Sequence, residues 1–274
     1  IDLMLTAGVI LNGQTMSIDI LSRKRNNNLP TWHLGKHLAN TVLEWMQPDT
    51  EQAFNKLCED PKHKKYFADK GWDQPGAITY KFNNHGFRCD DFNDAPCLVA
   101  LGCSYTLGLG LPISDIWPTL VGQELDLQVV NLAWNGYSAD SCFRLAEYWL
   151  PKLNPKLVVM FAPPQSRIEV LNESDTVVYT PSIFSDTSNL VSDRFLSDWM
   201  LFEENGRLNS IKNKLALQKL CYNHCVPCQI YDVFEFIAEP REVVEYARDH
   251  MHMGPKGHKM LANKIIKDWN NNGN

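Results

Sequence analysis

The sequence lacks long basic runs and long apolar runs. Its longest basic run is Arg23-Lys24-Arg25 and its net charge is −6, so it has no pattern typical of nucleic-acid binding. No apolar stretch reaches the roughly 20 residues needed to cross a bilayer. The N-terminal residues also lack the basic segment followed by an apolar core that is typical of a signal peptide. We therefore expect a cytoplasmic or otherwise soluble protein. Met16 suits a native start, so residues 1–15 are given little weight.

The eight cysteines do not indicate a disulfide framework, because the 274-residue chain is long enough to fold without one. The spacing Cys221-x-x-His224-Cys225-x-x-Cys228 leaves a zinc site, or a redox pair at Cys225 and Cys228, as alternatives. Structural zinc ligands normally come from two separated turns, whereas this run passes from a helix into a strand. We therefore expect reduced thiols, no metal and no cofactor.

The central and C-terminal parts of the chain alternate between short apolar runs and segments with helical spacing, and no internal repeat is present. Such alternation predicts a three-layer α/β/α fold with a parallel, flavodoxin-like sheet. The expected strands cover 98–102, 127–132, 157–162 and 228–231, and the expected helices cover 117–125, 139–153, 208–222 and 256–269.

The N-terminal third predicts a mixed α+β extension. Residues 32–46 and 50–68 have the spacing of amphipathic helices, and 77–87 reads as a hairpin with its turn at 83–86. We place an extension of unassigned role at 1–93 and a catalytic domain at 94–274. The polar stretch 168–196 is expected to be a long loop that shapes access to the site.

The segment Gly102-Cys103-Ser104 places a serine where the first strand of the α/β unit ends and a helix begins. Ligands of open α/β sheets bind at this carboxyl edge, and the helix N-terminus offers N–H groups to an oxyanion. On its own, however, Gly-x-Ser more often marks an ordinary helix-capping serine than a nucleophile. Ser104 needs support from elsewhere in the chain.

That support comes from Asp249, which stands three residues before His252 and ahead of the last expected helix. A carboxylate in this position can accept the Nδ1–H of the imidazole, so that Nε2 faces a serine and can take its proton. The residues and their spacing predict a Ser104–His252–Asp249 triad.

These blocks resemble the SGNH hydrolase superfamily, in which a Gly-Asp-Ser block follows the first strand and an Asp-x-x-His block precedes the last helix. The run Asn131-Leu-Ala-Trp-Asn-Gly136-Tyr-Ser resembles the family's second block, whose glycine donates its N–H to the oxyanion. The resemblance spans about residues 98–266. It implies an oxyanion hole that includes Ser104 and Gly136. Asn84-His85-Gly86-Phe87-Arg88 also resembles a lead-in of some SGNH-like proteins.

Two positions depart from the family pattern. Cys103 replaces the Asp before the serine, which in the family is not the triad acid. Gln165 stands where the third block has an Asn that completes the oxyanion hole. Its amide could donate in the same way, although it is one methylene longer, and loss of one such donor typically costs about 10²- to 10³-fold in rate.

Several neighbouring residues are assigned supporting or structural roles. Tyr105, Trp134 and Tyr137 border the expected site and are candidates for an apolar or sugar-stacking wall. The remaining expectations are a surface ion pair for Arg167 and Glu169, exposure to solvent for His250, and packing or capping for His258.

The resemblance implies a serine esterase without a cofactor, acting on a small-molecule or carbohydrate ester, and we favour a carbohydrate O-acetyl esterase. The alternative is a weakly active or inactive SGNH-fold module that binds or has a structural role, because fold alone does not ensure chemistry. Cys103 and Gln165 favour that alternative, whereas Asp249 and His252 argue against it. The oligomeric state is not predicted.

Overall fold

The computed structural model describes residues 6–11, 14–19, 33–171, 176–177, 199, 202–238 and 245–271. The chain forms two compact units, Ile1–Pro30 and Thr31–Asn274. In the first unit, β1 (Thr6–Leu11) and β2 (Gln14–Asp19) pair antiparallel. The boundary predicted at residue 93 falls inside the second unit.

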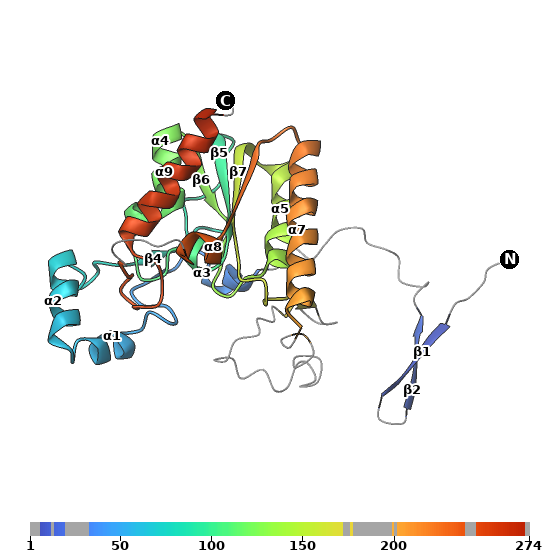
Figure 1. Ribbon diagram of the computed structural model, residues 1–274, viewed down its shortest axis with the longest axis horizontal. Coiled ribbons are helices and arrows are strands. Elements are labelled where there is room, and N and C mark those ends of the chain that lie inside the picture. The colour runs from blue at the N-terminus through green and yellow to red at the C-terminus, as the bar shows by residue number, and fades with distance from the viewer. Residues whose placement is uncertain are drawn as a thin grey trace. The chain divides into compact units, whose positions relative to one another are not determined.

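A four-stranded parallel sheet forms the centre of the second unit (Figure 1). It contains β5 (Pro96–Gly102), β6 (Gln128–Asn131), β7 (Asn154–Ala162) and β10 (Cys228–Asp232) in the order β10-β7-β5-β6. Each expected strand is therefore confirmed. The chain leaves β5 towards β6 but leaves β7 towards β10, so the direction of the connections changes between β5 and β7. Ligands of such sheets bind outside the carboxyl ends of the strands at this point.

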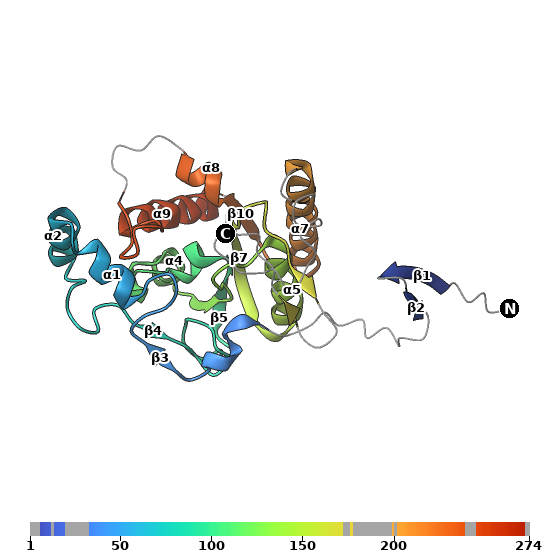
Figure 2. The same ribbon diagram turned by 90° about the horizontal axis from the view of Figure 1, so that it is seen from below.

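Helices cover both faces of the sheet, which confirms the three-layer α/β/α fold. One layer contains α4 (Trp117–Leu125) and α9 (Pro255–Asn271), and the other contains α5 (Ala139–Trp149) and α7 (Glu203–Asn223) (Figures 1 and 2). The shorter elements at the strand ends are α3 (Ser104–Leu107), α8 (Val233–Ala238) and the 3-10 turns Ile113–Asp115 and Leu150–Lys152.

The alternation of side chains along the central strands divides the core into two apolar clusters. Val99 and Leu101 of β5 enter one cluster, and Leu98 and Ala100 enter the other. Both faces are buried, because each layer of helices covers one of them. This explains why β5 reads as a continuous apolar run instead of an alternating one.

The helix expected over 32–46 is wrong for the part that the structure describes. Residues Leu34–Leu38 form a 3-10 turn, and Val42–Leu43 form β3, which pairs with β4 (Tyr80–Lys81). A Cβ at Gly35 would lie 2.4 Å from the Trp134 ring and 2.5 Å from the Gly86 carbonyl oxygen. This tertiary approach overrides the helical spacing of the apolar residues.

The second expected helix is divided in two, α1 (Glu51–Leu57) and α2 (Pro61–Lys70). Pro61 has no N–H to donate and suits the first turn of a helix, while the Asp60 side chain accepts from the Lys62 N–H as the N-cap. The turn at 83–86 is present, but the strand before it pairs with β3, so the hairpin expected over 77–87 is wrong.

Within the stretch 168–196 the structure describes Ile168, Glu169, β8 (Val170–Leu171) and β9 (Thr176–Val177), which pair antiparallel. The rest of the expected loop lies outside the described residues. No helix in the described part of the chain is long and apolar enough to span a membrane.

Candidate active site

Ser104 is the first residue of α3, directly after β5, and is 2% exposed. The turn from strand to helix is tight. A Cβ at Gly102 would lie 2.1 Å from the Thr106 hydroxyl and 2.9 Å from the Phe161 carbonyl oxygen, so only glycine fits there without a shift. The turn therefore directs the serine to the carboxyl edge of the sheet.

The structure brings Ser104, His252 and Asp249 together in one line of hydrogen bonds. The Ser104 hydroxyl lies 2.7 Å from His252 Nε2, and His252 Nδ1 lies 2.5 Å from Asp249 Oδ2. Because a carboxylate can only accept, Nδ1 carries the proton and Nε2 is the acceptor for the serine. A hydroxyl proton can thus move to the imidazole without rearrangement of the site.

Asp249 is held in its ionised form. Burial would raise the pKa of its carboxyl, but the hydrogen bond and charge of His252 lower it, as do the N–H groups of Met251 and His252, and the net pKa lies below its usual value. Asp249 Oδ1 accepts from these N–H groups at 3.0 and 3.1 Å. The carboxylate is therefore both oriented and available to an imidazolium.

Tyr105 packs edge-on against the imidazole of His252. Its ring centroid lies 4.8 Å from that of His252, with the rings at 63°. The side chain is partly buried, and burial raises the pKa of its hydroxyl to about 12. Tyr105 is the predicted wall residue that contacts the triad.

The two residues predicted to supply backbone oxyanion donors, Ser104 and Gly136, have N–H groups without a described backbone partner. Ser104 begins α3, so its N–H has no intrahelical partner, and in the described part of the chain neither it nor the Gly136 N–H donates a hydrogen bond. Gly136 has φ 82° in the turn after β6. That turn is linked to the serine helix by Asn131, whose amide donates to the Thr106 carbonyl at 3.1 Å.

Gln165 is placed differently from the other predicted site residues. Its side chain is exposed and lines a cavity of about 350 Å³ that also involves Trp199, Glu203 and Phe234 but includes neither Ser104 nor His252. Its backbone packs on α7, since a Cβ at Gly206 would lie 2.4 Å from the Gln165 carbonyl oxygen. No described contact joins its amide to the triad.

Trp134 and Tyr137 lie within the apolar core, with 7% and 0% of their surfaces exposed. The Tyr137 hydroxyl accepts from the Leu34 N–H at 3.3 Å, and Trp134 packs against Phe82. Both side chains therefore anchor the segment around 33–93 to the turn after β6, and their predicted role in substrate binding stays a prediction.

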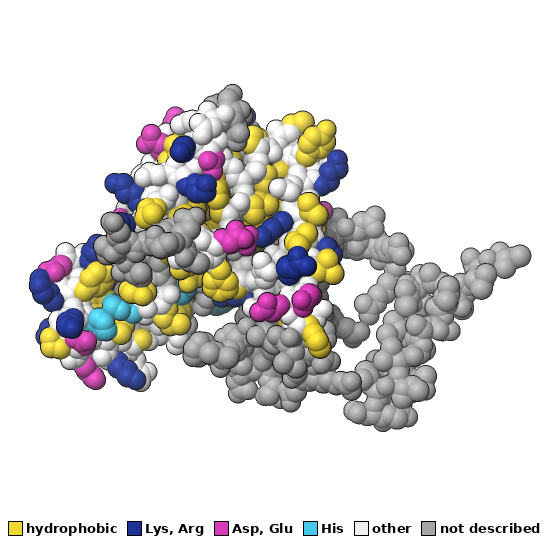
Figure 3. All heavy atoms as spheres, in the orientation of Figure 1, with side chains coloured by type: hydrophobic (Ala, Val, Ile, Leu, Met, Phe, Trp, Pro, Cys, Tyr) yellow, Lys and Arg dark blue, Asp and Glu magenta, His cyan; other side chains and the backbone are white. Residues whose placement is uncertain are grey.

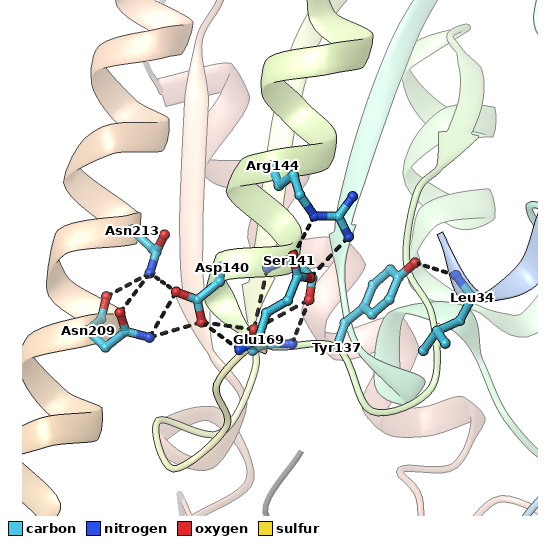
Figure 4. A network of polar contacts seen from close by, with 9 residues as sticks. Leu34, Tyr137, Asp140, Ser141, Arg144, Glu169, Asn209 and Asn213 are labelled. Carbon is cyan, nitrogen blue, oxygen red and sulfur yellow. Dashed lines mark hydrogen bonds and ion pairs between the residues drawn. The ribbon is translucent and has the colours of Figure 1, made fainter. Parts of the chain in front are cut away.

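The expected surface ion pair between Arg167 and Glu169 is wrong. Glu169 instead pairs with Arg144 of α5, where the two side chains are 3% and 4% exposed, and the Arg167 guanidinium donates to the Tyr137 carbonyl oxygen. Figure 4 shows this pair beside Asp140, whose carboxylate accepts from Asn209 and Asn213 of α7. The network joins α5, α7 and the segment after β7.

Two further histidines flank the triad. His258 is 1% exposed, and its Nδ1 accepts from the Trp117 N–H at 3.0 Å, which confirms a packing and capping role. His250 was expected to face solvent, but it is partly buried against His63 at a centroid distance of 4.2 Å. With φ 56° at His250, the loop turns the ring towards α2 and away from the sheet.

The cysteine cluster does not form the alternative zinc site. Among the described residues, no three His, Cys, Asp or Glu side chains are grouped to hold a metal ion. Cys221 and Cys228 hydrogen-bond to each other, which raises the pKa of Cys228, whereas His224 and Cys225 are exposed. The thiol pair that the structure contains is thus different from the predicted pair at Cys225 and Cys228.

The sequence analysis did not assign a role to several buried polar residues beside the site. One of them, Arg88, lies in the segment Asn84–Arg88 that resembles a lead-in of some SGNH-like proteins. Its guanidinium donates to the carbonyl oxygens of Leu107 and Gly108, at the C-terminal end of the serine helix. Burial lowers its pKa to about 10. Asp49 and Arg248, described below, carried no sequence signal at all.

No protein-family model and no curated protein sequence matches the chain. Similar solved structures include TesA, at 14% identity over 62% of this chain and 96% of that chain, with a TM-score of 0.34. The acetyl xylan esterase Est2A from the rumen bacterium Butyrivibrio proteoclasticus is 14% identical over 66% of this chain and 65% of that chain, with a TM-score of 0.35. A lipolytic protein of the G-D-S-L family from Desulfitobacterium hafniense DCB-2 is 14% identical over 62% of this chain and 97% of that chain, with a TM-score of 0.33. At these identities the similarity concerns the fold alone.

Proposed function

We propose that the chain is a serine esterase that hydrolyses carboxylic esters through Ser104, His252 and Asp249. The observation that carries the proposal is the unbroken line of hydrogen bonds, 2.7 Å from serine to imidazole and 2.5 Å from imidazole to carboxylate. A serine that only caps a helix does not require a histidine and a carboxylate hydrogen-bonded in line with its hydroxyl. It supplies a nucleophile, a base and a residue that orients the base.

In the proposed reaction, Ser104 Oγ attacks the carbonyl carbon of the ester while His252 Nε2 takes the hydroxyl proton. The tetrahedral intermediate then expels the alcohol, which receives this proton from His252, and leaves an acyl-serine. Water, activated by the same imidazole, hydrolyses the acyl-serine and restores Ser104. Asp249 orients the ring and stabilises the imidazolium in both halves.

The N–H groups of Ser104 and Gly136 are the proposed oxyanion donors, since neither has a described backbone partner. Gln165 is a third candidate, whose side chain would have to move from its exposed position to take part. Donors placed in advance at the developing charge are usually the largest electrostatic contribution to acyl transfer.

For the substrate, we propose an ester with a small acyl group on a carbohydrate alcohol. Tyr105 is only partly buried beside His252, so its ring is a candidate surface on which a sugar ring could stack near the reacting atoms. Initial rates on acetyl, butyryl and long-chain esters of one alcohol, together with acetylated oligosaccharides, test this choice. A preference for long chains would contradict it.

A fluorophosphonate probe with mass-spectrometric mapping tests the central proposal. We expect covalent labelling of Ser104 in the wild type and none in Ser104→Ala. No labelling of the wild type, or equal labelling of the variant, would favour the alternative of an inactive SGNH-fold module. That alternative draws on Cys103, whose side chain makes no capping hydrogen bond to α3, and on the exposed Gln165.

A further inference from the structure

The loop that carries Asp249 and His252 is contacted along its length by residues from the N-terminal third. The Tyr66 hydroxyl donates to the Tyr246 carbonyl oxygen at 2.6 Å, and Lys70 forms an ion pair with Glu245. Figure 3 shows histidine side chains among hydrophobic ones over α1 and α2, where the rings of His63 and His250 pack together. We name residues 245–254 the relay loop.

The most buried of these contacts is an ion pair between Asp49 and Arg248, the residue before Asp249. Arg248 Nε lies 2.9 Å from Asp49 Oδ1, and Nη2 lies 2.7 Å from Oδ2. The two side chains are 3% and 1% exposed. The guanidinium also stacks on Trp45 at 3.9 Å and donates to the Glu44 carbonyl oxygen. This two-point contact fixes the plane of the guanidinium as well as its position.

Asp49 is also connected, through Tyr80, to the segment that follows the helix of Ser104. The Tyr80 hydroxyl donates to Asp49 at 2.5 Å and accepts from the Gly110 N–H at 2.9 Å. Gly110 follows the serine helix, and its carbonyl oxygen accepts from the Arg248 N–H at 2.9 Å. One carboxylate is thereby connected to the relay loop and to the segment that follows Ser104.

The fit at Gly110 leaves little room for this connection to shift. Its φ is 71°, and a Cβ there would lie 2.9 Å from the Arg248 backbone nitrogen. A glycine is needed both for the backbone conformation and for the close approach of the two segments.

Stability alone is a weak reason for such a pair, because apolar residues of similar volume often replace a buried ion pair without loss. An apolar cluster, however, would not fix the orientation of the Arg248 side chain. The two hydrogen bonds between the Asp49 oxygens and the Arg248 nitrogens do fix it. The residue that benefits is Asp249, whose carboxylate must meet His252 Nδ1 at hydrogen-bond distance.

We propose that Asp49 is a positioning residue for the catalytic site, acting through Arg248 on Asp249 and through Tyr80 on the segment after Ser104. The proposal rests on the proposed function, since it assigns Asp49 a part in that site. It gives the segment 33–93 a role: this segment sets the relay loop against the nucleophile.

The test compares Asp49→Asn with Glu169→Gln in the full chain. Both changes remove one charge from a buried Arg–carboxylate pair and keep the side-chain volume. Among the described residues, no hydrogen bond or ion pair joins Glu169 or Arg144 to the relay loop or to α3. The measurements are the rate of fluorophosphonate labelling per folded molecule and the downfield proton resonance of His252 Nδ1. Folding is checked by circular dichroism.

We expect Asp49→Asn to slow labelling on the order of 10²-fold, as small misplacements of reacting groups do, and to shift or broaden the Nδ1 proton signal. Glu169→Gln should label within about threefold of wild type with an unchanged signal. Equal effects of the two variants, or an unchanged signal in folded Asp49→Asn, would overturn the proposal.

Tyr80→Phe serves if Asp49→Asn does not fold, because it deletes only the hydroxyl between Asp49 and Gly110. The expected result is slower labelling by about tenfold with a shifted Nδ1 signal, and wild-type values for both would overturn the proposal. If the wild type is not labelled, the proposed function fails, but the Nδ1 signal still decides whether Asp49 positions the relay loop.

Discussion

The candidate site has two parts, the hydrogen-bonded residues Ser104, His252 and Asp249 and the predicted oxyanion donors, and the structure supports the first part with more direct contacts than the second. On the relay side, Ser104, His252 and Asp249 lie in direct hydrogen-bond contact, and buried polar groups hold the loop that carries the last two. On the oxyanion side, the Ser104 and Gly136 N–H groups have no described backbone partner, and Gln165 is exposed at another cavity. In the proposed reaction, the contacts for proton transfer are thus already present, whereas the proposed oxyanion donors are mainly backbone groups.

Replacing Asp249, the residue proposed to orient His252, should reduce kcat/KM more than any other change considered. Asp249→Asn keeps the shape of the side chain but no longer selects the tautomer with Nδ1 protonated. We expect kcat/KM for an acetyl ester to fall about 10⁴-fold, equivalent to roughly 5 kcal/mol of transition-state stabilisation. The measurement is the initial rate below saturation, with purified Ser104→Ala as the blank. A loss smaller than tenfold would mean that Asp249 does not orient the base.

Glu169→Gln tests how much the buried pair between α5 and the segment after β7 contributes to stability. Breaking its buried pair leaves Arg144 charged and without this carboxylate, so we expect a loss of about 3 kcal/mol in the free energy of unfolding. Urea denaturation at neutral pH measures it, with Lys65→Met as a control because its pair with Asp69 is largely exposed. A control variant that loses as much as Glu169→Gln would remove the distinction between the two pairs.

Gln165→Ala asks whether the third oxyanion donor is used. Because the amide is exposed and away from the triad, we expect kcat to fall less than tenfold, below about 1.4 kcal/mol. A fall of 10²- to 10³-fold would instead show that the side chain moves into the oxyanion hole during the reaction. Gln165→Asn, which introduces the residue found at this position in the family that the motifs resemble, distinguishes a missing amide from a misplaced one.

The last prediction concerns His258, which packs behind the loop that carries Asp249 and His252, and the dependence of stability on pH. Burial, together with the charges of His252 and Arg88, lowers its pKa to about 3. The unfolded chain therefore binds a proton below about pH 6.5 that the folded chain does not, and stability is lost as pH falls from there towards the folded pKa. The free energy of unfolding should fall by about 1.4 kcal/mol per pH unit from this residue.

His258→Asn should flatten this part of the pH dependence, since the Asn amide oxygen can still accept from the Trp117 N–H. Unfolding midpoints of both proteins between pH 4 and 7 provide the measurement. Parallel curves for the two proteins would show that His258 does not titrate as its burial requires.

The sequence by itself determined the α/β core, and it picked out Ser104, His252 and Asp249, which the structure joins by hydrogen bonds. Apolar runs such as 98–102 are long enough for buried strands and too short for helices, and the Asp-x-x-His spacing is a local geometric property of one turn. Ser104 follows from both, because the end of a parallel strand is where ligands reach the sheet. These features could be predicted because each depends on residues that are close together in the sequence.

The tertiary structure alone decided how the site is held. Asp49 and Arg248 are 199 residues apart, and neither stands in a pattern that requires a partner. The close approach at Gly35 likewise replaced an expected helix. The Gln165 backbone packs against α7, and its side chain lies exposed at a cavity that includes neither Ser104 nor His252. These outcomes depend on which surfaces meet after folding, and side-chain periodicity carries no information about such pairings.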